Sequence, residues 1–160
     1  MTTKKPYLQR SDIEKLNTQW YKLSGLHSRE EWSAAVIRAA TAAEIAANHA
    51  IRQEFRAQSQ LDPKFVDDLL WWANGLRGKI ERLLLPMTRS DATKHASLKT
   101  LLGLAKQVNK KRNAIAHSGE FCNKKEATAA IDHARQFVTV LMQIYEPEFQ
   151  LKERNVKSET

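Results

Sequence analysis

The chain of 160 residues contains little cysteine, glycine or proline and no long apolar run. Its single cysteine, Cys122, excludes an internal disulfide and suits a reducing compartment, so we expect a cytoplasmic protein. The longest apolar run is far shorter than the roughly 18 residues of a membrane-spanning helix, and residues 1–10 lack the apolar stretch of a secretory signal. No cluster of Cys, His, Asp and Glu has the spacing of a metal site. We therefore expect no membrane insertion, no metal and no other cofactor.

Apolar residues recur with the period of a helix along most of the chain, and no segment alternates apolar and polar residues as a strand does. The sequence predicts an all-α fold, a compact bundle of about five helices, in a single domain over residues 1–160. We expect its core at about residues 28–148 and a charged, frayed tail at 151–160. A domain of this length buries roughly 70% of the surface of its unfolded chain, so a hydrophobic core suffices to hold it together.

Capping residues set most of the expected helix boundaries. Ser28 with Glu31, and Asn123 with Glu126, have the spacing of capping boxes, and Ser11 stands before the first apolar-periodic segment. The expected helices run from about 12 to 23, 28 to 58, 62 to 86, 97 to 117 and 123 to 148.

Glycine and proline mark the remaining boundaries. Pro63 follows Asp62 at the start of the third helix, and Gly75 and Gly78 predict a kink within it. The polar segment 87–96 is expected to be a loop. Gly119 is placed to end the fourth helix just after His117.

Positive charge is in excess and unevenly distributed. Lys and Arg number 26 against 18 Asp and Glu, which gives a formal net charge of +8. Such a protein attracts phosphate backbones, although a basic surface is also compatible with a protein that binds no nucleic acid. Between residues 104 and 125 a single acid, Glu120, lies among six basic residues: Lys106, Lys110, Lys111, Arg112, Lys124 and Lys125.

The fourth predicted helix carries an arginine where its apolar pattern requires a buried side chain. Leu98, Leu101, Ala105 and Val108 form the stripe, and Arg112 is the next position in the same register. A guanidinium is rarely buried without partners. Arg112 therefore either extends its charged end into solvent at the end of the bundle, or lines a cleft or subunit interface where an anion binds.

A histidine follows Arg112 closely but not on the same face of the helix. His117 lies about 140° around an ideal helix from Arg112, whereas Asn113 is four residues before His117 and shares its face. Asn113 is therefore expected to hold the imidazole in one orientation. Arg112 can act on the same phosphate in three ways: the helix ends near His117, the long side chain wraps around the helix, or a second copy of the chain supplies its own residues.

Arg112, Asn113 and His117, in the segment Arg-Asn-Ala-Ile-Ala-His, resemble the R-x4-6-H motif of the HEPN superfamily in the form with Asn after Arg. The resemblance covers roughly residues 28–148, because in that family the motif lies late in the penultimate core helix and a long helix follows it. A second match to the spacing, from Arg89 to His95, lacks the Asn and precedes the fourth helix.

This resemblance implies a metal-independent endoribonuclease. Members of the family commonly act as dimers with two motifs facing across a shared cleft, and many are toxins or defence effectors. It therefore implies RNA as substrate, a homodimer, and an antitoxin or other co-encoded partner. The subgroup paired with nucleotidyltransferase-type antitoxins usually has Tyr two residues after the His. Gly119 stands there in this chain, so the resemblance does not extend to that partner.

The side chains suit cleavage of RNA through its 2′-hydroxyl group, which DNA lacks. The imidazole of His117 can act as general base or acid, and Arg112 can stabilise the negative charge that builds on the phosphate. Asn113 would orient His117 or a phosphate oxygen. The expected products carry a 2′,3′-cyclic phosphate and a 5′-hydroxyl. Five lysines are expected to bind the RNA backbone: Lys106, Lys110, Lys111, Lys124 and Lys125.

Two further groups of residues have alternative interpretations. His49, with Glu44 and Asn48, can face the same cleft, but a solvated or core-edge position is favoured. Trp71 and Trp72 can stack on bases. Because adjacent helix positions diverge, we favour one indole in the core and the other at an interface.

Two other functions remain compatible with the sequence. The fold can bind RNA or a nucleotide without turnover, or it can be a structural subunit in which Arg112 and His117 complete a helix interface. Cys122 has no neighbouring base specified by the sequence, so we expect a buried, unreactive thiol.

Overall fold

The computed structural model describes residues 5–73 and 75–153, which form an all-α structure without a strand. The expected fold class is therefore confirmed. The helices are α1 (Asp12–Ser28), α2 (Trp32–Gln58), α3 (Pro63–Trp72), α4 (Leu76–Gly78), the π-helical segment η2 (Lys79–Leu84), α5 (Leu85–Met87), α6 (Ala92–Ser118) and α7 (Lys124–Tyr145), preceded by a 3-10 turn η1 (Tyr7–Gln9). Within the described ranges no helix is long and apolar enough to cross a membrane.

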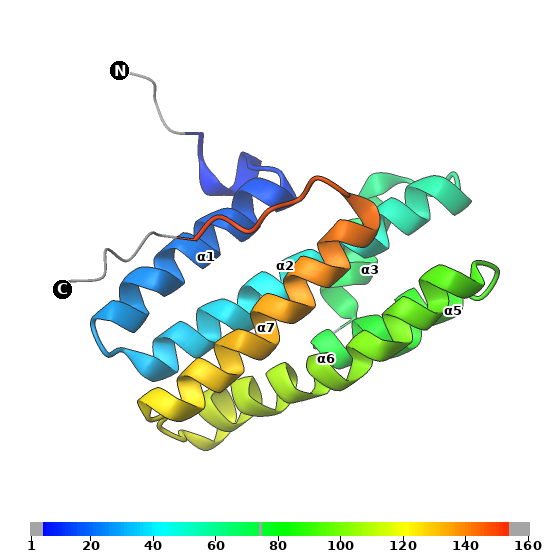
Figure 1. Cartoon of the computed structure of the whole chain (residues 1–160). Helices are drawn as coiled ribbons and strands as arrows, with labels where there is room; N and C mark the ends of the chain where they lie inside the picture. Colours follow the sequence, from blue (N-terminus) through cyan, green and yellow to red (C-terminus); the bar gives the residue numbers. More distant parts are fainter. Residues whose placement is uncertain (1–4, 74, 154–160) are drawn as a thin grey trace.

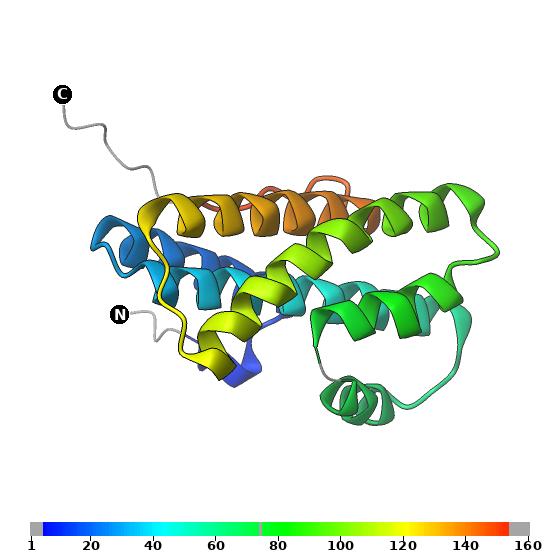
Figure 2. The ribbon, with the colours of Figure 1, turned by 90° about the horizontal axis from the view of Figure 1, so that it is seen from below.

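α2 is the central helix of the bundle. α1 and α7 run alongside it, and α6 crosses obliquely and contacts both α2 and α7 (Figures 1 and 2). Ala43, Ala46 and Ala47 of α2 are fully buried, as are the large side chains Trp20 of α1 and Phe137 of α7. The small residues of α2 leave room for these large side chains, so the helices pack closely around it.

Two capping boxes start helices, but not both of those expected. At α1, Ser11 accepts a hydrogen bond from the backbone of Glu14, whose carboxylate accepts one in return. Asn123 and Glu126 form the expected box at α7. The box expected at Ser28 is wrong, because α1 continues through that residue. The chain turns at Glu30, whose φ of 62° is left-handed, and α2 begins at Trp32.

α6 begins five residues earlier than expected, so most of the segment 87–96 is helix and loop only in part. The carboxylate of Asp91 accepts a hydrogen bond from the Lys94 backbone at 3.0 Å and caps the helix at Ala92. The first turn, Ala92–His95, has no strong apolar period, which hid it from the pattern. At the other end Gly119 terminates α6 as expected, with a left-handed φ of 66°.

The single kinked helix expected from 62 to 86 is instead divided. α3 ends at Trp72, and Gly75 takes a φ of 81°, which only glycine adopts without strain, so the chain leaves the helical path there. The chain then resumes as α4, η2 and α5. α3 stands to one side of the other helices (Figure 2). The break places the segment 75–82 beside α6, where it forms part of a pocket.

Residues 151–153, expected to be frayed, are docked on the bundle. Glu153 accepts hydrogen bonds from the buried indole N–H of Trp20 at 3.0 Å and from Arg135 at 2.6 Å. The Lys152 backbone donates to Asn17 at 3.2 Å. Figure 1 shows this stretch running back towards α1. A buried indole N–H needs an acceptor, and Glu153 provides it. The rest of the predicted tail, 154–160, lies outside the described residues.

Candidate functional site

The last turns of α6 bring Arg112, Asn113 and His117 together. One terminal nitrogen of Arg112, Nη1, lies 3.1 Å from Nε2 of His117 and donates to Oδ1 of Asn113 at 3.1 Å. α6 continues through His117 to Ser118, so the helix end does not align the two faces. The long arginine side chain wraps around the helix instead. Of the three arrangements that the sequence left open, the wrapped side chain is present within one chain, and a contribution from a second copy stays a prediction.

Asn113 plays a different part from the one expected. Its side-chain oxygen accepts from the guanidinium of Arg112, and no hydrogen bond joins it to His117 in the described structure. Asn113 therefore does not hold the imidazole through a direct hydrogen bond, and its alternative role, orienting a phosphate oxygen, stays a prediction. The reason is electrostatic, because the carbonyl of Asn113 has a charged donor within reach, and such hydrogen bonds are the stronger ones. Asn113 positions Arg112, and Arg112 in turn holds His117.

The contact between Arg112 and His117 fixes the role of the imidazole nitrogen. A guanidinium can only donate, so this contact is a hydrogen bond in the neutral tautomer that carries the ring proton on Nδ1 and leaves Nε2 as the acceptor. Nε2 therefore carries its lone pair at an exposed position. Arg112 is half-buried and His117 is exposed. An incoming anion can take the guanidinium as its own donor and leave Nε2 free to accept a proton.

The three residues line one side of a pocket of about 490 Å³. The opposite side is formed by the segment after the break at Gly75. The remaining lining residues are Gly75, Arg77, Gly78, Glu81, Arg82 and Asn109. A Cβ placed on Gly75 would lie 3.6 Å from the side chain of Asn109, so the segment approaches α6 closely at that point.

Positive charge dominates this pocket, which we call the Arg112 pocket. Arg77, Arg82 and Arg112 line it against one carboxylate, Glu81. Arg77 donates to Glu81 at 2.8 Å, and Lys106 lies 3.9 Å from the same carboxylate. The hydrogen bond from Arg77 lowers the pKa of Glu81, which keeps it ionised. A net positive cavity that is open to solvent attracts phosphate.

Arg77, Arg82 and Asn109 line the pocket but were not predicted from the sequence. The local pattern holds a signal only for Asn109, because Asn109, Asn113 and His117 are spaced four residues apart and share one face of α6. The two arginines reach the site only because the chain breaks at Gly75 and runs back beside α6. No periodicity along the sequence indicates that approach.

The five lysines expected to bind the RNA backbone occupy different environments. Lys110, Lys124 and Lys125 are exposed, and Lys106 lies beside the Arg112 pocket. Lys111 is already paired, because its ammonium lies 2.6 Å from Glu120 and 3.4 Å from Glu126. The hydrogen bond to Glu120 raises the pKa of Lys111. Lys111 therefore joins α6 to the loop and to the start of α7, and its charge is largely compensated.

The chain was compared with models of protein families, with curated proteins and with solved structures, and none matches it. The likeness to the HEPN superfamily thus stands on the motif and its position in the sequence.

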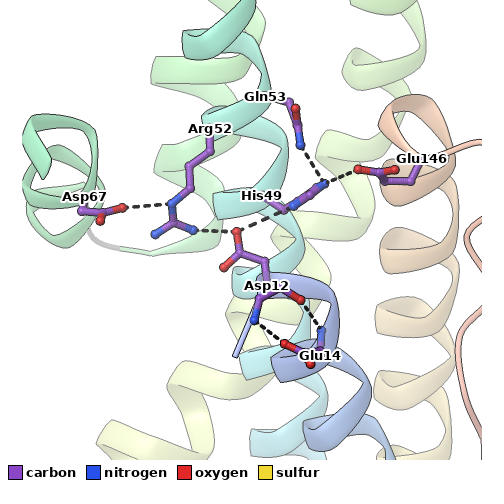
Figure 3. Close-up of polar contacts among 8 residues, drawn as sticks. Asp12, Glu14, His49, Arg52, Gln53, Asp67 and Glu146 are labelled. Carbon is purple, nitrogen blue, oxygen red and sulfur yellow. Dashed lines mark hydrogen bonds and ion pairs between the residues drawn. The ribbon is translucent and has the colours of Figure 1, made fainter. Parts of the chain in front are cut away.

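His49 does not face the Arg112 pocket. It is 8% exposed, and its ring nitrogens lie 3.7 Å from Asp12 and 3.1 Å from Glu146, while Gln53 lies 3.4 Å away (Figure 3). The favoured core-edge position therefore agrees with the structure. Arg52 extends the cluster by pairing with Asp12 at 2.8 Å and with Asp67 of α3 at 3.0 Å. These contacts join α1, α2 and α3 to the end of α7.

Trp71 and Trp72 are 80% and 77% exposed, so the expectation that one indole lies in the core is wrong. α3 contacts α2 only lightly and buries Val66 and Leu70 instead. Glu44 and Asn48 lie with both indoles on a second pocket, separate from His117. Among residues 5–73 and 75–153 no group of three or more Cys, His, Asp or Glu suits a metal ion.

Cys122 is buried beside Val36 and Ala127, and burial raises the pKa of its thiol. A raised pKa keeps the sulfur protonated and unreactive at neutral pH. This environment agrees with the expected structural role.

Proposed function

We propose that the chain is a metal-independent endoribonuclease of HEPN type. One observation supports this most strongly: Arg112 Nη1 lies 3.1 Å from His117 Nε2 at the edge of a basic pocket. A cation and a proton acceptor within one hydrogen bond of each other can act on the same phosphodiester. The resemblance of the motif to the HEPN superfamily agrees with this chemistry.

In the proposed reaction the phosphate enters the Arg112 pocket and takes hydrogen bonds from Arg112. Nε2 of His117 then accepts the proton of the ribose 2′-hydroxyl, whose oxygen forms a bond to phosphorus. The bond from phosphorus to the 5′-oxygen breaks on the opposite side. That oxygen takes a proton from water or from a second copy of His117 in a homodimer. The products are a 2′,3′-cyclic phosphate and a 5′-hydroxyl.

Other residues act by attraction and positioning. Asn113 keeps the guanidinium of Arg112 in place through its side-chain oxygen. Arg82 attracts the phosphate from the opposite wall, and Arg77, which is paired with Glu81, adds less. The exposed lysines Lys110, Lys124 and Lys125 add sequence-independent attraction for the RNA backbone, Lys106 beside the pocket adds to it, and Lys111, largely compensated, adds least.

We further propose a cytoplasmic role as a toxin or defence effector, with a co-encoded protein as its regulator. The alternative is a module of the same fold that binds RNA or a nucleotide without cleaving it. The two differ in turnover alone, so a cleavage assay separates them.

The test uses an end-labelled, single-stranded RNA in excess EDTA. We expect cleavage to persist, with 2′,3′-cyclic phosphate ends. Arg112→Ala and His117→Ala should each lower the rate at least about 100-fold. Arg89→Ala is the matched control, because Arg89 belongs to the second match to the motif spacing and is exposed outside the pocket. Binding without cleavage would support the alternative. Equal rates in Arg112→Ala and Arg89→Ala would overturn the proposed role of Arg112.

A further inference from the structure

A second pocket, of about 580 Å³, lies between α2, α3 and η2. We call it the Lys79 pocket. Gly75 lines both this pocket and the Arg112 pocket, so the two adjoin at the break between α3 and α4. A chain that passes from one pocket to the other would cross the backbone at Gly75, which has no side chain of its own.

Two polar groups in the Lys79 pocket lack partners. Lys79 is 5% exposed and, within the described structure, makes no hydrogen bond or ion pair. Burial lowers its pKa, and the charge of Glu44 only partly offsets this. The side-chain oxygen of Asn48 is buried and also has no hydrogen-bond partner. A buried polar group destabilises a fold unless a hydrogen-bond partner satisfies it. The presence of two such groups in one pocket therefore indicates a ligand with both donors and acceptors.

Arg52, on the wall of the same pocket, differs from Lys79. Its guanidinium is held by Asp12 and Asp67, as Figure 3 shows. Arg52 therefore fixes α3 against α2 and contributes little to a ligand. The groups left available are the carboxylate of Glu44, the amide of Asn48 and the ammonium of Lys79.

The indoles of Trp71 and Trp72 line the pocket, although they are among the most exposed large side chains of the described structure. Exposed aromatic faces beside polar groups are the arrangement by which proteins stack and read unpaired bases. A base stacked on an indole would present its edge to the polar groups within.

We propose that the Lys79 pocket binds one unpaired base of the RNA, next to the phosphodiester held at Arg112 and His117. The proposal rests on the proposed ribonuclease function for the identity of the ligand. Guanine fits the free groups best. Its adjacent N1–H and N2–H can both donate to the carboxylate of Glu44, and its O6 accepts from the ammonium of Lys79. Adenine and cytosine would place an acceptor nitrogen against that carboxylate.

The test measures binding without cleavage. The probes are fluorescein-labelled 2′-O-methyl uridine hexamers with one guanine or one adenine at the third position, which have no free 2′-hydroxyl for the reaction. Fluorescence anisotropy gives the affinity, and quenching of tryptophan fluorescence reports stacking. We expect the guanine probe to bind about tenfold more tightly than the adenine probe, and we expect its binding to quench the exposed indoles.

Glu44→Gln and Lys79→Met should each remove this preference for guanine. Lys79→Met should also keep or raise the melting temperature, because it removes a buried charge that has no partner. Lys99→Met, an exposed lysine of α6 that lines neither pocket, is the matched control and should change neither property.

Unchanged affinity and base preference in both Glu44→Gln and Lys79→Met would overturn the proposal. So would a homodimer that dissociates in the Trp71→Ala variant while RNA affinity stays the same, because the indoles would then serve a second copy of the chain. Failure of the ribonuclease proposal looks different: the guanine probe binds with the expected dependence on Glu44 and Lys79, but natural RNA is not cleaved.

Discussion

His49 and His117 both lie beside charged side chains, but their surroundings differ. His49 is buried between carboxylates that come from α1 and from the end of α7. His117 is exposed, and among residues 5–73 and 75–153 its Nε2 contacts only the guanidinium of Arg112, on the same helix. A histidine whose two nitrogens face carboxylates from other elements stabilises the fold. His117 is held by a single cation, and a phosphate can bind that cation in its place. His117 is then available for a reaction.

The largest expected effect of this difference is on the cleavage rate. His117→Ala should lower the single-turnover rate by about 100-fold to 10,000-fold, because it removes the proposed proton acceptor. His49→Ala should leave the rate per folded molecule within about threefold of the unchanged protein, since His49 lies outside the Arg112 pocket. Measuring both variants on the same labelled RNA checks the comparison. A comparable loss in His49→Ala would show that the two sites are coupled.

The effect on stability should be the reverse. His49→Ala should lower the free energy of unfolding by about 2 kcal/mol, because a buried side chain is lost and the carboxylates beside it lose a partner. His117→Ala should change it by less than about 0.5 kcal/mol, as is usual for an exposed position. Urea denaturation followed by circular dichroism gives both values. If the two substitutions lowered the free energy of unfolding equally, His49 would not differ from His117 in its contribution to stability.

Acid should remove the stabilisation that Asp12 gives to the folded protein through its contacts with His49 and Arg52. Burial opposes ionisation of Asp12, but the hydrogen bond with His49 and the charge of Arg52 outweigh it, so its pKa in the folded protein lies below the ordinary 3.8. The unfolded chain therefore binds this proton at a higher pH than the folded one. The stabilisation from Asp12 is complete above about pH 4 and is lost as the pH falls through the folded pKa.

Melting temperatures measured from pH 7 to pH 2 test this. Asp12→Asn should lower stability at neutral pH and flatten its decline in acid. Asp68→Asn, an exposed carboxylate of α3 outside the cluster, serves as control and should leave the curve unchanged. If Asp12→Asn shows the same decline as the unchanged protein, the carboxylate does not contribute as described.

The smallest effects concern the lysines. Lys124→Ala and Lys125→Ala should each weaken RNA binding slightly and reduce the dependence of log affinity on log salt by about 0.7 if each contacts one phosphate of a single strand. Lys111→Ala should reduce it less, because its ammonium is already paired with Glu120 and Glu126. RNA titrations between 50 and 200 mM salt measure these slopes. An equal or larger reduction for Lys111→Ala would show that RNA displaces its carboxylate partners.

Local features of the sequence predicted much of the fold. The all-α class, the end of α2 at Gln58, the capping box at Asn123 and the end of α6 at Gly119 all follow from nearby residues. The predicted helix boundaries were wrong where the local capping signal was absent or was compatible with two structures. Asp91 caps α6 without an acid three residues later, and the spacing of Ser28 and Glu31 imitates a capping box although Ser28 is the last residue of α1.

Only the part of the candidate site that lies on one helix, α6, was predicted from the sequence. Arg112, Asn113 and His117 are close in sequence, so their proximity could be anticipated, although the actual partner of Asn113 could not. Arg77 and Lys79 reach their pockets through the break at Gly75. That approach depends on how α3 and η2 pack against α2 and α6, which local periodicity does not encode.

A double-mutant cycle tests most directly whether Arg112 and His117 act on one phosphodiester. Single-turnover cleavage rates are measured for Arg112→Ala, His117→Ala and the double variant, all in excess EDTA. The effects of substituting residues that act as a unit are strongly non-additive. The double variant should therefore cleave nearly as fast as the less active of the two single variants. Losses that simply multiply in the double variant would contradict a shared phosphate.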